Sequence, residues 1–172
     1  LYTDPKTGKY TADRQEFQKG VVKDLMSNGS TTEGTSFFLG GAPATGKSSI
    51  IKSGDVSLPK GILVVDSDVI KGKMPEYNEM VKQNYDKAAA RAHEESSSIS
   101  KDLVKNAASK KYDIVNDGVG DGKFESVKAK ADEQRAAGKS VVAHYVTTDT
   151  EVSIDRARAR AEKSGRKVPE EY

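Results

Sequence analysis

The feature that most constrains the fold of this chain is the stretch 41–48, which reads Gly-Ala-Pro-Ala-Thr-Gly-Lys-Ser. It matches G-x-x-x-x-G-K-[ST] at every fixed position, and this pattern forms a phosphate-binding loop between a strand and a helix. The context agrees, because the apolar run 36–39 precedes the loop and a helix is predicted over 46–53. Glycines in such a loop let backbone N–H groups turn inward around phosphate oxygens. The loop therefore predicts binding of a nucleoside triphosphate.

Individual loop residues have separate expected roles. Lys47 is a compact cation suited to the β- and γ-phosphates, and the hydroxyl of Ser48 is suited to Mg²⁺. A nucleoside triphosphate and Mg²⁺ are therefore the expected ligands of the loop. The predicted nucleotide-binding residues are Gly41, Ala42, Pro43, Ala44, Thr45, Gly46, Lys47, Ser48 and Ser49.

Short apolar runs alternate with helix-length segments along the chain. Within each run, apolar residues follow one another without alternating polar residues, which is typical of parallel strands covered on both faces. Together with the phosphate loop, this arrangement predicts an α/β protein with the three-layer P-loop NTPase/kinase fold and a mostly parallel sheet of four to five strands. The predicted strands are 36–39, 62–65, 112–115 and 141–146; the predicted helices are 12–26, 46–53, 76–110, 124–137 and 150–163.

Composition and length limit the alternatives. The 172 residues suit one domain, with a loop and helix over 1–34 packed on a kinase domain over 35–172. The chain starts with Leu, so we expect a piece of a longer protein. It has no Cys, which excludes disulfides and thiol catalysis and suits a cytoplasmic location. With 28 basic and 26 acidic residues and no long apolar run, neither nucleic acid nor a membrane is an expected partner.

Three acidic residues follow predicted strands. Asp66 and Asp68 come after the second strand and Asp117 after the third. Ligands of open α/β sheets lie beyond the carboxyl ends of the strands, where a kinase needs a carboxylate to accept the proton of the acceptor hydroxyl. We expect Asp68 to be this base and Asp66 and Asp117 to contact substrate. The alternative for each residue is a helix N-cap or a loop carboxylate.

Basic residues are dense in the last predicted helix and beyond it. Ile154, Ala157 and Ala161 share the face expected to meet the core, with Arg156 pointing away and Arg160 on the flank. Most of these charges are expected to be solvated. Phosphoryl transfer uses one or two Arg to stabilise charge on the γ-phosphate, and we expect Arg160 and Arg166 in this role.

Taken in order, these motifs resemble the zeta-toxin group of P-loop kinases from about residue 11 to residue 170. The Walker loop alone would fit many families, whereas the ordered set is far more specific. The resemblance rests on an N-terminal helix and on the stretches 40–49, 65–71, 74–77, 93–97, 116–121 and 156–169.

The resemblance implies an activity and roles for residues. The best-known zeta toxins use ATP and Mg²⁺ to phosphorylate the sugar 3′-hydroxyl of UDP-N-acetylglucosamine, and an antitoxin protein blocks their ATP site. By this resemblance Asp68 is the catalytic base and Lys47 the loop lysine, while Asp117 is a site carboxylate. Arg160 and Arg166 match the two lid arginines.

The sequence also departs from the family pattern where the sugar nucleotide is held. Val119 and Asp121 replace a Thr and an Arg, Lys101 aligns with a site carboxylate, and Lys71 replaces an Arg after the base. Lys cannot fork onto an anion as Arg does, although Lys71 keeps a charge suited to substrate. The acceptor is thus expected to be a nucleotide-sugar or, as alternatives, a nucleoside or dinucleotide. A nucleotide-binding module without an acceptor is a further alternative.

Overall fold

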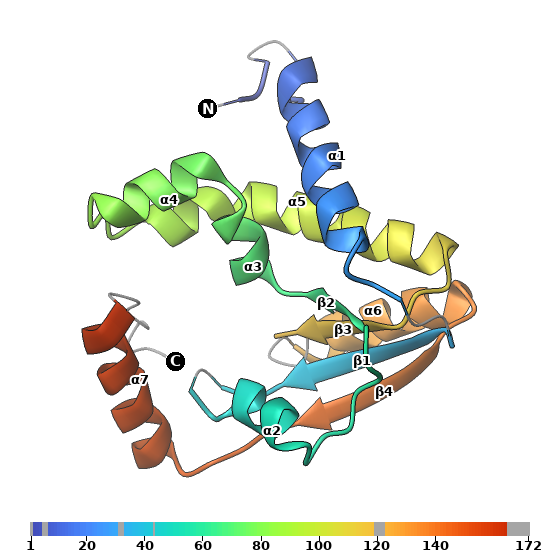
Figure 1. Ribbon diagram of the computed structural model, residues 1–172, viewed down its shortest axis with the longest axis vertical. Helices are drawn as coiled ribbons and strands as arrows, with labels where there is room; N and C mark the ends of the chain where they lie inside the picture. The colour runs from blue at the N-terminus through green and yellow to red at the C-terminus, as the bar shows by residue number, and fades with distance from the viewer. Residues whose placement is uncertain (1, 5–6, 31–32, 43, 119–122, 165–172) are drawn as a thin grey trace.

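The computed structural model of this chain describes residues 2–4, 7–30, 33–42, 44–118 and 123–164. Figure 1 shows helices around a sheet whose arrows point toward the side where α7 stands. The elements are α1 (Ala12–Met26), β1 (Thr35–Gly40), α2 (Lys47–Ser53), β2 (Leu63–Val65), α3 (Ser67–Gly72), α4 (Pro75–Lys82), α5 (Ala88–Ser109), β3 (Ile114–Asp117), α6 (Phe124–Ala136), β4 (Ser140–Tyr145) and α7 (Thr150–Ser164). No described helix is long and apolar enough to cross a membrane.

The sheet has four parallel strands in the order β2-β3-β1-β4, which confirms the predicted α/β fold. Consecutive residues of β3 are buried, Ile114 fully and Val115 to 2% exposure, so both faces of this central strand are covered. The edge strands differ from the prediction. Val64 of β2 is 45% exposed and Val142 of β4 is 38% exposed. An apolar run therefore identified each strand, but coverage of both faces holds only in the middle of the sheet.

The main core lies between α1, α5 and the β2–β3 side of the sheet. The predicted α5 stripe is confirmed, because Ile99, Leu103 and Ala107 are all fully buried. Val22 and Leu25 of α1 are buried in the same cluster. The N-terminal helix is thus packed on the core, while the boundary at residue 34 stays a prediction.

The single helix predicted over 76–110 is wrong, because the structure divides it into α4 and α5. Asn84 lies between them with a φ of +53°. Asn adopts this left-handed conformation more readily than most residues, so the chain turns here without Gly or Pro. The short helix α3 was not predicted. Asp66 is its N-cap, and its side chain accepts a hydrogen bond of 2.7 Å from the N–H of Asp68.

A buried ionic cluster joins α1 to α4 and α5. Arg14, only 7% exposed, donates two hydrogen bonds to Glu95, at 2.6 and 3.0 Å, and two to Glu76, at 3.0 and 3.1 Å. Its guanidinium also lies 4.1 Å from the ring centre of Tyr2 and 4.3 Å from that of Phe17. The planar guanidinium suits this double bidentate grip, which Lys could not make.

The cluster predicts a loss of stability in acid. Burial acts to raise the pKa of Glu76, but hydrogen bonds from Arg14 and Tyr2 outweigh it and hold the pKa below its ordinary value. A lowered pKa contributes stability that is present above the ordinary value, near 4.5, and is lost as pH falls through the folded value.

We therefore expect Glu76→Gln to lower the melting temperature at pH 7 and to reduce its fall below about pH 4.5. Thermal melts across this range measure both effects. Glu79→Gln, on the exposed side of α4, is the matched control and should behave as the parent. An acid slope unchanged in Glu76→Gln would contradict the prediction.

Candidate phosphate-binding site

The phosphate loop lies between the end of β1 and the start of α2, as predicted. Gly41 has a φ of +136°, and a Cβ on it would lie 2.2 Å from the carbonyl oxygen of Val146. Ala44 and Gly46 also have positive φ, of +62° and +104°. The loop is closed by a 2.9 Å hydrogen bond from the Thr45 hydroxyl to the Ala42 carbonyl. Its backbone therefore requires glycine where the sequence has it; Pro43 lies outside the described residues.

Lys47 and Ser48 occupy the first turn of α2. The ammonium of Lys47 donates to the carbonyl oxygens of Gly41 and Ala42, the latter at 3.4 Å, so it lies over the loop. Ser48 and Ser49 are exposed on the same turn. A glycine cradle, a cation above it and a free-standing hydroxyl fit a phosphate group with Mg²⁺. Their binding of nucleotide and Mg²⁺ stays a prediction.

The strand-end carboxylates lie at the same edge of the sheet as the loop. Asp117 is the last residue of β3 and pairs in register with Leu39 of β1, two residues before Gly41. Asp66 follows the last residue of β2, and β2 is the other neighbour of β3. These groups thus lie at the carboxyl edge of the sheet, where open α/β sheets bind their ligands.

Asp68 and Lys71 form a pair on α3. Their Oδ1 and Nζ atoms are 3.4 Å apart, with the Lys71 side chain 9% exposed and that of Asp68 39% exposed. Burial lowers the pKa of Lys71, and the charge of Asp66 opposes part of this shift. Asp68 is therefore accessible and held beside a buried cation, whereas Asp66 serves as the cap of the helix. Their roles toward substrate stay predictions.

The arginine helix α7 approaches the loop through a different residue from those expected. Arg156 Nη1 lies 3.4 Å from the carbonyl oxygen of Thr45. The predicted core face of α7 is wrong, because Ile154 is 43% exposed. The side chain of Arg160 and the whole of Arg166 lie outside the described residues. The sequence held a signal for Arg156, since it lies one turn before Arg160 and shares its helix face.

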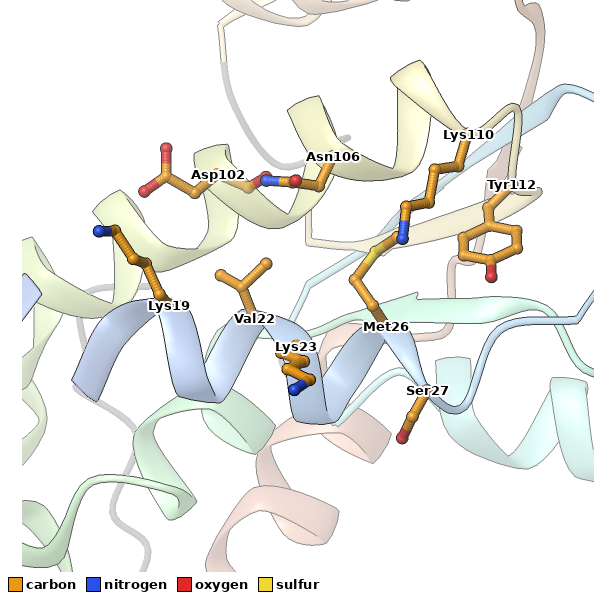
Figure 2. Close-up of a pocket in the computed structure, with 9 residues that line it drawn as sticks. All are labelled: Lys19, Val22, Lys23, Met26, Ser27, Asp102, Asn106, Lys110 and Tyr112. Carbon is orange, nitrogen blue, oxygen red and sulfur yellow. The ribbon is translucent and has the colours of Figure 1, made fainter. Parts of the chain in front are cut away.

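One cavity of the described structure lies away from this site. It has a volume of about 520 Å³ and lies between α1 and the second half of α5, where Figure 2 shows Val22 and Met26 among three lysines. Its lining residues precede β1 and β3 in the chain, so it lies toward the amino ends of the strands. The phosphate loop is at the opposite, carboxyl edge, and the cavity takes no part in the site.

The fold and the loop define a P-loop protein of the α/β kinase type. The model of the family described as Zeta toxin matches residues 21–172. The chain therefore belongs to the Zeta toxin family, a kinase-like family of P-loop proteins. Among curated proteins, none matches the chain.

Solved structures support the same fold. The chain is similar to a structure from the PezAT chromosomal toxin–antitoxin system of the human pathogen Streptococcus pneumoniae. Their TM-score is 0.71 at 22% identity, over 90% of this chain and 65% of that one. Two structures of the AvrRxo1-ORF1:AvrRxo1-ORF2 complex, one native and one with sulphate ions, each have a TM-score of 0.61, at 18% and 19% identity. Both AvrRxo1 matches cover 87% of this chain and 50% of the other chain. This chain therefore spans half to about two-thirds of the length of the three matched chains.

Proposed function

We propose that the chain is an ATP-dependent small-molecule kinase of the zeta-toxin type. The proposed acceptor is a hydroxyl of a nucleotide-sugar such as UDP-N-acetylglucosamine. One observation carries the proposal: a phosphate loop and the accessible carboxylate of Asp68 both follow parallel strands at one edge of the sheet. A base and a γ-phosphate site at one edge are the two parts that transfer to a hydroxyl requires.

In the proposed reaction Asp68 accepts the proton of the acceptor hydroxyl. The hydroxyl oxygen forms a bond to the γ-phosphorus, the bond from that phosphorus to the bridging β,γ-oxygen breaks, and ADP leaves. Lys47, Arg160 and Arg166 stabilise the negative charge on the transferred group. Mg²⁺, when bound through Ser48, supplies further charge neutralisation at the phosphates. Asp117, Asp66 and Lys71 are the proposed contacts for the acceptor.

A second acceptor class is favoured by the state of Lys71. Its ammonium is buried and lies beside Asp68, which leaves it less open to a diphosphate than an Arg at the surface would be. The sequence gives a second reason, because the charge of Asp121 would repel a diphosphate. A nucleoside or dinucleotide hydroxyl is therefore the alternative acceptor.

The decisive experiment is a transfer assay with γ-labelled ATP and Mg²⁺. The acceptors are UDP-N-acetylglucosamine, a nucleoside, a dinucleotide and none, each with the parent chain and with Asp68→Asn. Label on the nucleotide-sugar that disappears in the variant supports the first acceptor, and label on another acceptor supports the second. ATP binding without transfer to any acceptor would overturn the kinase proposal in favour of a nucleotide-binding module.

The family likeness also motivates a partner. The PezAT structure comes from a toxin–antitoxin system, and the AvrRxo1 structures are two-component complexes. We therefore include in the proposal a protein partner of the antitoxin kind. We propose that this partner blocks the ATP site. Co-purification with the product of an adjacent open reading frame is the direct test of the partner. A partner that left ATP binding unchanged would contradict the blocking of the ATP site.

Arg156 provides a sharper test of the α7 side of the site. We expect Arg156→Gln to lower kcat for transfer about tenfold, with ATP affinity changed less. A well-aligned donor to the transition state contributes about 100- to 1000-fold. Arg156 donates to the Thr45 carbonyl of the loop, over 3.4 Å, and so lies beside the phosphate site, for which we expect a smaller effect.

Steady-state kinetics measure this effect, and Arg158→Gln is the matched control. Arg158 is on the same helix, its side chain is 72% exposed, and its ion pair with Asp155 spans 4.0 Å. An exposed ion pair of this kind contributes little to stability, so Arg158→Gln should fold as the parent does and have the same kcat. Equal kcat values for the two variants would argue against a role for Arg156.

A further inference from the structure

The buried cluster around Arg14 connects parts of the chain that are far apart in sequence. Arg14 and Gln18 are on α1, Glu76 opens α4, and Glu95 is in the middle of α5. Gln18 donates to Glu95 at 2.8 Å, and the Tyr2 hydroxyl donates to Glu76 at 2.9 Å. Both carboxylates therefore receive hydrogen bonds in addition to those from Arg14, so the cluster is fixed in one geometry.

The Glu76 arm of this cluster reaches the helix that carries Asp68. Glu76 is the second residue of α4, and α3 ends four residues before it, at Gly72. The turn between them is tight, with Met74 N–H bonded to Lys71 O at 2.9 Å and Asn78 Nδ2 bonded to Gly72 O at 2.9 Å. Holding the start of α4 therefore also holds the end of α3.

A second contact from α1 reaches the same turn. Asp24 forms an ion pair of 2.8 Å with Lys73, which lies between α3 and α4. Arg14 and Asp24, ten positions apart on α1, thus bind Glu76 after the α3–α4 turn and Lys73 within it. In Figure 1, α1 descends from the N-terminal segment past α3 and crosses α5.

The cluster also lies partly outside what the chain shares with its family model. The match begins at residue 21, so Tyr2, Arg14 and Gln18 precede it, while Glu76 and Glu95 are inside it. The Arg14 side of the contact with the α3–α4 turn thus comes from a segment that the family model does not describe, while Asp24 lies within the match.

We propose that Arg14 is a positioning residue, which through Glu76 holds α3 and its carboxylate Asp68 in place at the carboxyl edge of the sheet, the edge that also carries the phosphate loop. The proposal rests on the proposed function for the role of Asp68. Arg14 touches no reacting group and acts through two helices. A base displaced by about 1 Å can lose 100-fold in rate, so a brace on its helix affects turnover without contact to substrate.

The test uses Glu76→Gln and Arg14→Lys, with amide hydrogen exchange over residues 67–74 as the first readout. Glu76→Gln loosens the α4 arm and leaves the Arg14–Glu95 pair in place, so the chain should stay folded. Arg14→Lys keeps the charge and loses both bidentate grips. We expect exchange in α3 to rise about tenfold in both variants, with that in β1 and β3 unchanged.

The second readout is transfer kinetics. We expect kcat to fall about 10- to 100-fold in both variants, with the KM for ATP within about twofold, because the loop itself is untouched. Arg135→Lys is the matched control, since Arg135 is an exposed arginine on α6 with a surface ion pair to Asp132. It should leave exchange and kcat at the parent values.

Exchange and turnover separate the two proposals. Unchanged α3 exchange, or a fall in melting temperature with unchanged kcat, would overturn the positioning role and leave the cluster as a stabilising element. Absence of transfer in the parent chain would overturn the proposed function, and the exchange of α3 would still decide whether Arg14 braces that helix.

Discussion

Replacement of Asp68 by Asn is expected to lower kcat for phosphoryl transfer by about 100- to 10,000-fold, the usual contribution of a general base. Asn has nearly the same shape but cannot accept the proton of the acceptor hydroxyl at neutral pH. The N–H of residue 68 that bonds to the Asp66 carboxylate is retained, so the α3 cap should survive. Labelled-ATP transfer measures the rate, and isothermal titration measures ATP binding, which we expect within about threefold of the parent.

Two further variants make this result specific. Asp132→Asn removes an exposed carboxylate on α6 and should leave turnover unchanged. Asp66→Asn keeps a good N-cap, because Asn and Asp cap helices about equally well, so any loss it causes reports the charge of Asp66. Turnover of Asp68→Asn at the parent rate would refute the role of Asp68 as the base.

Replacement of Gly41 by Ala is expected to weaken ATP binding by at least about 100-fold and to lower stability. The new Cβ would lie 2.2 Å from the carbonyl oxygen of Val146, so the loop or the end of β4 must move. The positive φ of Gly41 adds a further penalty for any residue with a side chain, about 1–2 kcal/mol. ATP titration and thermal melts measure the two effects.

Gly138→Ala separates the steric clash of a new Cβ from the cost of a positive φ. Gly138 also has a positive φ, of +78°, but a Cβ there meets nothing within 4 Å. It follows α6, far along the chain from the loop. This control should lose about 1 kcal/mol of stability and keep its ATP affinity. Equal ATP affinities of Gly41→Ala and the parent would show that the loop tolerates the displacement.

Much of the fold could be predicted from local sequence signals. The phosphate loop is a contiguous motif, and the stripe Ile99–Leu103–Ala107 follows helical spacing, so neighbouring residues alone determine both. The carboxyl-end rule located Asp66 and Asp117 at the sheet edge once the strands were identified. The break at Asn84 was missed because no Gly or Pro marks it, and α3 because six residues are too few for a periodic pattern.

Other features depend on long-range packing that no local pattern encodes. Arg14 is 62 positions from Glu76 and 81 from Glu95, and nothing near Arg14 in the sequence distinguishes it from a solvated arginine. The orientation of α7 was also misjudged. Small and apolar residues suggested a core face, but Ile154 is exposed and Arg156 extends to the loop.

The contact between Gly41 and the end of β4 has a mechanical consequence for α7. Val146 is buried, and its N–H bonds to the Gly40 carbonyl at 2.9 Å, so the last part of β4 is anchored beside the phosphate loop. Only residues 147–149 separate this anchor from the first residue of α7. Any swing of α7 must pivot on these three residues. A rotation of the backbone at residues 147–149 would therefore displace the C-terminal end of α7 more than its first turn, which lies beside the loop.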